Sequence, residues 1–125
     1  MRVEIIVPPD FQRGVIEDIE QIMVTDAKEL RKIMIEEFHR PKHGREYRRA
    51  RGPHRASAPG EPPAYDTGTL ERSITEPHAH KLSTGVVVEV DIDAPYAAEL
   101  EYGRAGIAAR PFVEPAIEEL IRRAA

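Results

Sequence analysis

The stretch SAPGEPPAYDTGTLERSI, residues 57–74, divides the chain into two unlike halves. Its first part places Pro59, Pro62 and Pro63 around Gly60. Proline removes a backbone hydrogen-bond donor and glycine loosens regular structure, so this composition excludes a regular helix or a central strand. We therefore expect a stiff, irregular segment where the two halves of the fold meet. It offers rigid backbone rather than a nucleophile, a base or a metal ligand.

The half before this stretch is predicted to form a short strand and one long helix. Residues 2–7 alternate loosely in Val and Ile, which indicates a strand. After two prolines, Asp10 is expected to cap a helix that runs from residue 11 to about residue 39, with acidic and basic residues on its outer face. At about 43 Å this helix is longer than the domain needs. We therefore expect a bend near residues 25–26 or an end that projects toward a partner. Its apolar stripe comprises Phe11, Val15, Ile19, Ile22, Met23, Ala27, Leu30, Ile33, Met34 and Phe38.

The half after the stretch is predicted to begin with an antiparallel hairpin. Residues 85–92 are the clearest strand, and residues 72–80 form a weaker partner because Pro77 cannot donate to a ladder. A helical turn capped by Asp66 or Thr67 is expected just before the hairpin. The residues of the clear strand that face one way are Val86, Val88, Val90 and Ile92.

Two helices are predicted to close the chain. Residues 96–102 form a short helix ended by Gly103, and a small-residue loop follows over residues 104–109. Pro111 then stands at the entry of a last helix whose basic end, residues 122–123, suits a helix C-terminus. The apolar stripe of this helix comprises Phe112, Val113, Ala116, Ile117, Leu120 and Ile121.

These elements predict an α+β fold in which a long N-terminal helix and a C-terminal helix pack on a small, mainly antiparallel sheet. The 125 residues suit a single domain, 1–125, with the strand and long helix in 1–40, a basic and Pro-rich loop in 41–64, and the strands and last helix in 65–125. The chain has no cysteine, which excludes disulfides, thiol catalysis and thiolate metal sites. No secretory signal and no membrane-spanning run is expected.

The segment from residue 39 to residue 55 is strongly basic. It carries a charge of +6 in a chain whose net charge is −4, and it has no periodicity, so we expect a mobile loop unless something acidic holds it. The two interpretations are a solvated loop and a contact with DNA phosphates or with an acidic protein face. Aromatic side chains are sparse here, so readout of particular bases is not expected. The candidate contact residues are Arg40, Lys42, Arg45, Arg48, Arg49, Arg51 and Arg55.

Two motifs invite a chemical interpretation, and both are weak. Asp66-Thr67-Gly68 has the letters of an aspartic-protease loop, but that chemistry needs paired aspartates between buried strands, and polar or Pro-rich residues flank this copy. Among the five histidines, His78 and His80 would share one face of a strand, yet no established metal-binding motif is present. We therefore assign no catalytic residue, no cofactor and no metal site, and we expect the protein not to be an enzyme.

Three motifs that occur in order resemble a known family. They are Ser57 to Pro63 with Asp66 to Leu70, then Pro95 to Gly103, then Ala109 to Ala116. In words these are a Pro-Gly-Glu-Pro-Pro loop, a Thr-Gly-x-Leu turn, a Tyr-Ala segment that ends in Glu-Tyr-Gly, and an Arg-Pro-Phe entry to the last helix. The pattern is similar to the neck and tail-completion family of long-tailed bacteriophages, also labelled minor tail or head–tail joining proteins. Arg104 departs from it, since the family commonly has a small residue there.

This resemblance implies a small α+β virion subunit that forms a homo-oligomeric ring between the head–tail junction and the tail tube. Its partners would be neighbouring neck and tail proteins, with possible non-specific contact with genomic DNA, and it would use no membrane or small-molecule substrate. It would reside in the virion and, before assembly, in the host cytoplasm. The alternatives are a DNA-binding accessory protein that uses the basic loop and, for the aromatic residues, packing within the chain's own core. The subunit-interface candidates are Pro59, Gly60, Pro62, Pro63, Tyr96, Glu99, Glu101, Tyr102, Arg110 and Phe112.

Overall fold

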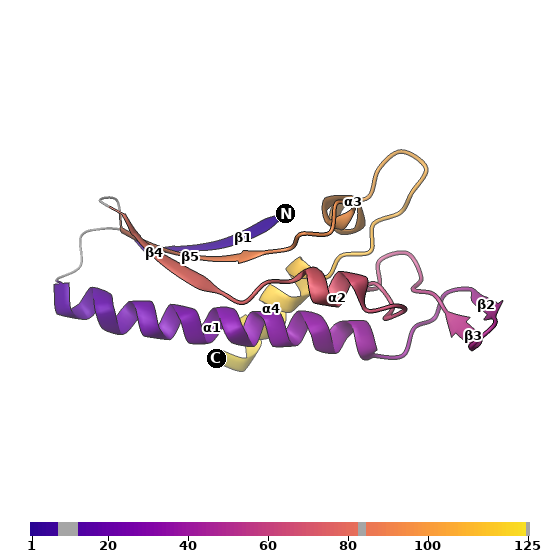
Figure 1. Cartoon of the computed structure of the whole chain (residues 1–125), viewed down its shortest axis with the longest axis horizontal. Helices are drawn as coiled ribbons and strands as arrows, with labels where there is room; N and C mark the ends of the chain where they lie inside the picture. Colours follow the sequence, from indigo (N-terminus) through magenta and orange to yellow (C-terminus); the bar gives the residue numbers. More distant parts are fainter. Residues whose placement is uncertain (8–12, 83–84, 125) are drawn as a thin grey trace.

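The computed structural model describes residues 1–7, 13–82 and 85–124, and in this range the fold is α+β as predicted. A long helix lies along one face of a three-stranded sheet, and a two-stranded hairpin stands apart at one end (Figure 1). The elements are β1 (Arg2–Val7), α1 (Arg13–His39), β2 (Glu46–Arg49), β3 (Gly52–Arg55), α2 (Thr69–Ser73), β4 (His78–Leu82), β5 (Gly85–Asp91), α3 (Ala97–Tyr102) and α4 (Val113–Ala124).

The sheet has the order β1-β5-β4, and both pairings are antiparallel. Its central strand is β5, whose prediction is confirmed: Val86, Val88 and Val90 are buried, with Ile92 just beyond them. Side chains alternate between the faces of a strand, so Glu89 and Asp91 lie on the opposite, outer face. Because α1 contacts β5 and β4, the inner face forms the core and the outer face carries most of the sheet's polar groups.

Helix α1 runs unbroken for 27 residues, about 40 Å, and does not bend near residues 25–26 (Figure 1). Ile22 was expected in the apolar stripe but is 59% exposed. The buried face of α1 is narrower than the predicted stripe and excludes this position. The predictions that involve Asp10 and Phe11 lie outside the described residues. The buried residues of α1's stripe are Met23, Ala27, Leu30, Ile33, Met34 and Phe38.

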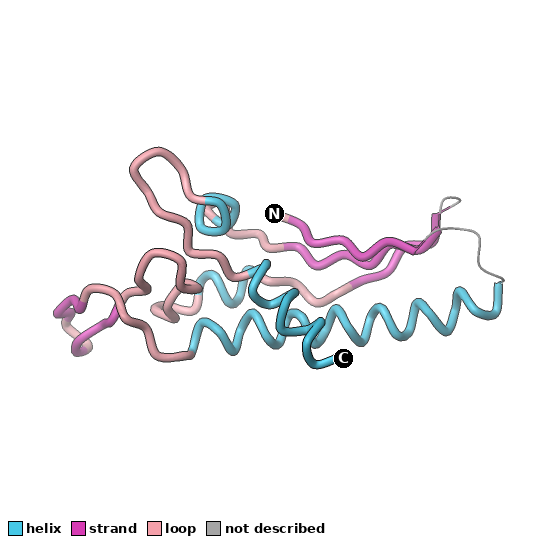
Figure 2. The backbone as a smooth tube through the Cα atoms, turned by 180° about the vertical axis from the view of Figure 1, so that it is seen from behind, coloured by secondary structure: helices cyan, strands magenta, loops and turns pink. Residues whose placement is uncertain are grey.

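Helix α4 packs on α1 rather than on the sheet, which corrects the predicted arrangement (Figure 2). Only the first part of its apolar stripe is buried, at Val113 and Ala116, whereas Ile121 is 64% exposed. The basic end of α4 reaches back to α1, since the Arg123 guanidinium lies 2.7 Å from Glu29. Burial at one end and ion pairing at the other therefore fix α4 on α1.

The segment expected to be an irregular loop contains a hairpin, β2–β3, and this corrects the prediction for residues 42–56. The turn at residues 50–51 leads into Gly52, whose φ of +111° suits glycine. Pro53 is paired opposite Arg48, which a two-stranded ribbon tolerates because each strand has a free edge. The turn that Gly52 allows therefore pairs the two strands despite the repulsion between their arginines.

Two further boundaries differ from the predictions. Helix α2 begins after Gly68, which has a φ of +82°, and neither Asp66 nor Thr67 caps it with a side-chain hydrogen bond. The weak strand begins at residue 78 rather than 72, after an isolated bridge between Ile74 and Ile92. Pro77 explains the late start, because it precedes the first residue that enters the ladder.

Candidate assembly surface

The three motif segments that prompted the resemblance contact one another. The Gly60 amide donates to the Ala109 carbonyl at 2.9 Å, and the Arg110 Nε donates to the Ser57 hydroxyl at 3.1 Å. The Arg110 amide also donates to the Leu100 carbonyl of α3. These hydrogen bonds join the Pro-rich loop, the short helix and the entry to α4, although the first and last are some fifty residues apart. We call this region the motif end.

Glu61 ties the Pro-rich loop to the start of the hairpin. Its Oε1 accepts the amides of His43 at 2.9 Å and Ala58 at 2.8 Å, and its Oε2 lies 2.9 Å from the His43 ring nitrogen. The hydrogen bond from the His43 side chain, followed by that from Ala58, lowers the pKa of Glu61 to about 2. The loop is therefore held by an ionised carboxylate at neutral pH.

Glu101 was expected as a subunit-interface residue, and its position corrects this. It is 6% exposed, and its carboxylate accepts the amides of Phe112 at 2.9 Å, Val113 at 2.8 Å and Glu114 at 3.1 Å. These are the free amides at the start of α4, which no intrahelical carbonyl can accept. Glu101 is thus a cap supplied by α3 to the next helix.

The other interface candidates divide into covered and exposed groups. Phe112 is completely buried and lies 5.5 Å from Phe38, ring centre to ring centre, so it is a core residue and not a surface anchor. Pro63 is buried and Pro62 half-buried. Glu99 lies 3.3 Å from Arg104 within the chain. The candidates whose side chains or backbone remain exposed are Pro59, Gly60, Tyr96, Glu99 and Tyr102.

A shallow pocket of about 230 Å³ opens at the motif end. It is lined by Phe38, Pro63, Tyr65, Leu70, Tyr96 and Leu100, among others. Tyr65 stacks on His39 with ring centres 4.5 Å apart, which holds one wall against the end of α1. The lining also includes Asp66 and Glu71, so the pocket combines aromatic and aliphatic walls with an acidic rim. Such a pocket suits a side chain from another protein that is apolar or carries a positive charge.

The hairpin carries most of the predicted cationic residues, and we call residues 45–55 the arm. Arg49 forms an ion pair with Asp66, and Arg55 lies 3.1 Å from Glu46. Arg45 lies over the Tyr47 ring at 5.2 Å, a cation–π contact. These contacts fasten and stiffen the arm.

The other four of the seven predicted cationic residues take no part in the contacts just described. Lys42 is half-buried and donates to the Glu37 carbonyl at the end of α1, and burial lowers its pKa. Within the described part of the chain, Arg40, Arg48 and Arg51 form no ion pair and are exposed. Arg48 and Arg51 therefore give the arm its free positive charge.

Glu37 is a buried acid that the sequence pattern assigned to the polar face of the long helix. It is 4% exposed, and its Oε2 has no hydrogen-bond partner in the structure. Burial, opposed by Arg40 and Lys42, raises the pKa of Glu37 to about 7. Glu101 of α3 and Glu119 of α4 add to the rise in pKa, so this side of α1 is covered through packing that the helical period does not reveal.

The Asp66-Thr67-Gly68 segment leads into α2 rather than lying between buried strands. Arg49 lowers the pKa of Asp66 and holds its exposed carboxylate in the ionised state.

No helix among the described residues is long and apolar enough to cross a membrane. No family model, curated protein or solved structure matches the chain, so the fold and the geometry above carry the functional argument.

Proposed function

We propose that this chain is a structural subunit of the virion of a tailed phage or prophage, and that it assembles as a ring at the head–tail junction. The observation that carries the proposal is the motif end, where the three segments that resemble the neck and tail-completion family are hydrogen-bonded into one region. Rigid loops lose little conformational entropy on docking, which favours repeated contacts between copies.

The exposed aromatic residues of the motif end supply anchors for such contacts. Tyr102 is 76% exposed at the end of α3, and Tyr96 lines the shallow pocket. Tyrosine combines a large apolar ring with a polar tip and is common at the centres of interfaces. A head-to-tail contact between the motif end of one copy and a different surface of the next closes a ring when it repeats around an axis.

The arm supports the same proposal. A two-stranded hairpin is at best marginally stable by itself, and β2 is exposed along its whole length. Its free edges and its cations, Arg48 and Arg51, suit an acidic surface on an adjacent subunit or ring. A partner of that kind would pair with the strand edges and cations of the arm that are exposed in the single chain.

The assembly proposal is tested by the mass of the purified chain in solution, alone and mixed with the proteins that its neighbouring genes encode. We expect a discrete closed oligomer whose population grows with concentration. Tyr102→Asp should deplete it, whereas Ile121→Asp, at a residue of α4 that is also mostly exposed, should not. A chain that stays monomeric at every concentration and with every neighbour would refute the proposal.

A second candidate function, a DNA-binding accessory protein, is favoured by Arg48 and Arg51, which are exposed and form no ion pair with any residue that the structure describes. Each phosphate contact releases counterions, so affinity for duplex DNA should fall steeply with salt. The double change Arg48→Glu and Arg51→Glu should abolish binding, whereas Lys28→Glu, exposed on α1, should have a smaller effect. An affinity that does not respond to salt would exclude phosphate contacts, and tight binding by a stable monomer would favour this function over the ring.

A further inference from the structure

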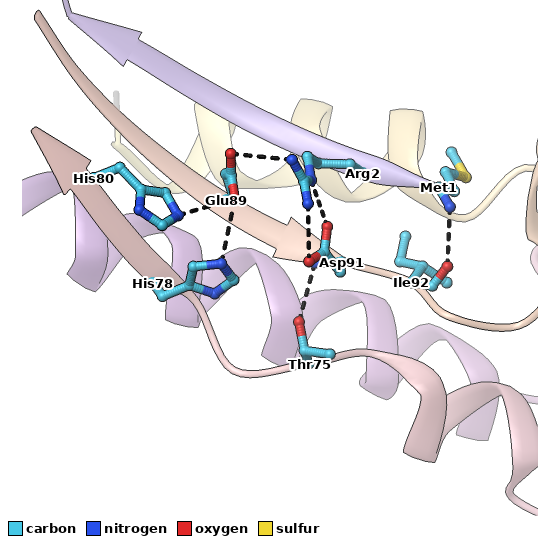
Figure 3. A network of polar contacts seen from close by, with 8 residues as sticks. All are labelled: Met1, Arg2, Thr75, His78, His80, Glu89, Asp91 and Ile92. Atoms are coloured by element: carbon cyan, nitrogen blue, oxygen red, sulfur yellow. Dashed lines mark hydrogen bonds and ion pairs between the residues drawn. The ribbon is translucent and has the colours of Figure 1, made fainter. Parts of the chain in front are cut away.

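Two histidines and a glutamate converge on the outer face of the sheet (Figure 3). His78 and His80 are two residues apart on β4 and therefore point to the same face. Glu89 lies on β5 directly opposite His78 in the antiparallel register. The two histidines share one face, as the sequence predicted, but only the pairing of β4 with β5 brings the glutamate to them.

The distances match those of a metal-binding triad. The Nε2 atoms of His78 and His80 each lie 3.2 Å from Glu89 Oε2. One ligand atom from each of the three residues lies within 4.8 Å of the others. In a tetrahedral zinc site the ligand atoms are about 3.3 Å apart, because zinc–nitrogen and zinc–oxygen distances are about 2.0–2.2 Å. The two histidine–glutamate distances already meet this value, and the third ligand–ligand distance, at most 4.8 Å, is to be adjusted by rotation of the imidazole rings.

The supporting contacts leave one carboxylate oxygen available for a metal. Arg2 lies 3.2 Å from Glu89 Oε1, on the side away from the histidines, and is itself fixed by Asp91 at 2.6 Å. Glu89 is much less exposed than either histidine. A neighbour that orients a ligating carboxylate is characteristic of built metal sites. Arg2 therefore holds Glu89 with its second oxygen turned toward His78 and His80.

We propose that His78, His80 and Glu89 form a surface site for a divalent transition-metal ion of the zinc class. Two imidazoles and one carboxylate are the donors that such ions take when thiolates are absent, and the chain contains no cysteine. Three protein ligands leave a coordination position open for water or for a group from another molecule. Bound metal would cross-link β4 to β5. The inference does not depend on the proposed function.

The remaining histidines provide internal controls, because each faces a single carboxylate. His39 lies 2.9 Å from Glu71, His43 lies 2.9 Å from Glu61, and His54 lies 4.0 Å from Asp66. A histidine–carboxylate pair without a second imidazole offers two ligands rather than three. Specific binding should therefore be lost when His80 is replaced and retained when His43 is replaced.

The test uses the untagged full chain after treatment with a chelator, titrated with zinc chloride in a calorimeter. We expect one ion per chain and shifts in the imidazole resonances of His78 and His80 in nuclear magnetic resonance spectra. The melting temperature should rise with zinc concentration, since the metal binds the folded state. His80→Gln should weaken zinc binding at least about tenfold, whereas His43→Gln should leave it unchanged.

A second pair of variants separates a metal ligand from a structural ion pair. Glu89→Gln removes a ligand and also the partner of Arg2, and it should weaken zinc binding as much as His80→Gln. Arg2→Gln breaks the same ion pair but keeps all three ligands. Because Arg2 only orients Glu89, this variant should bind zinc more weakly than the unaltered chain but more tightly than Glu89→Gln, still with one ion per chain. The proposal is overturned if zinc shows no saturable binding, if His43→Gln weakens it as much as His80→Gln, or if Arg2→Gln abolishes it.

Discussion

The buried carboxylate of Glu101 accepts the backbone amide of Val113 at 2.8 Å and so joins the end of α3 to the start of α4. The same carboxylate oxygen also accepts the Phe112 amide at 2.9 Å. A carboxylate at a helix N-terminus satisfies free amides and interacts favourably with the helix dipole. The position of α4 on α1 therefore depends on a residue that belongs to neither helix.

Glu101→Ala should lower the free energy of unfolding by about 2–4 kcal/mol, because it leaves buried amides without an acceptor. Urea unfolding followed by circular dichroism measures this change. Glu99→Ala, on the exposed side of the same helix, should cost less than about 1 kcal/mol, since it loses only a surface ion pair. Equal losses in the two variants would contradict the capping role.

Glu37→Gln should stabilise the protein at pH 8 and have little effect at pH 5. Because the pKa of Glu37 is raised from 4.5 to about 7, the folded chain holds a proton that the unfolded chain releases. Stability therefore falls as pH rises through this window, and the neutral variant avoids the loss, on the order of 2–3 kcal/mol. Urea unfolding at both pH values measures the difference. Asp26→Asn, exposed on the same helix, should show none, and a gain from Glu37→Gln that is equal at both pH values would refute the assignment.

Acid should release the Pro-rich loop through Glu61. The pKa of this carboxyl is lowered to about 2, so its stabilising effect is complete above its usual pKa of 4.5 and is lost as pH falls through about 2. At neutral pH, Glu61→Ala should mimic the acid state and lower the hydrogen-exchange protection of the Ala58 and His43 amides several-fold. Glu46→Ala, on the arm, should leave Ala58 protected. Unchanged protection in Glu61→Ala would mean that the loop is held by other contacts.

Phe112→Ala should cost about 3–5 kcal/mol of folding free energy, because the ring is fully buried against Phe38. Tyr102→Ala should change stability by less than about 0.5 kcal/mol, because its ring is mostly in solvent. Thermal or urea unfolding of both variants measures the contrast. If Tyr102→Ala destabilised the isolated chain as strongly, its ring would belong to the core and not to an interface.

Much of the fold is readable from short-range pattern. The alternation of Val86, Val88 and Val90 predicted the central strand, and apolar residues at helical spacing predicted α1 and its end at His39. Gly103 ended α3 as expected. These features depend on periodicity and on backbone preferences, which neighbouring residues express without knowledge of the rest of the chain.

The candidate sites were less readable. The sequence identified the arginines of the basic segment but not the hairpin that presents Arg48 and Arg51. It offered Glu101 and Phe112 as interface candidates and left core packing open for the aromatic ring, and in the structure one caps α4 and the other fills the core. Residue type and spacing do not distinguish an exposed carboxylate or ring from a buried one when the covering element comes from elsewhere in the chain.

The amino-acid sequence by itself determined β1 and β5, the end of α1, the stiffness of residues 57–63 and the placing of His78 and His80 on one face, because each follows from local spacing. Only the tertiary structure decided that α4 lies on α1, that Glu37 is buried, that Glu101 caps α4 and that Glu89 meets the two histidines. Those relationships join residues far apart in the chain. The free energies of these contacts come from burying apolar groups and from satisfying backbone groups that packing removes from water. Both effects arise only once the elements have packed.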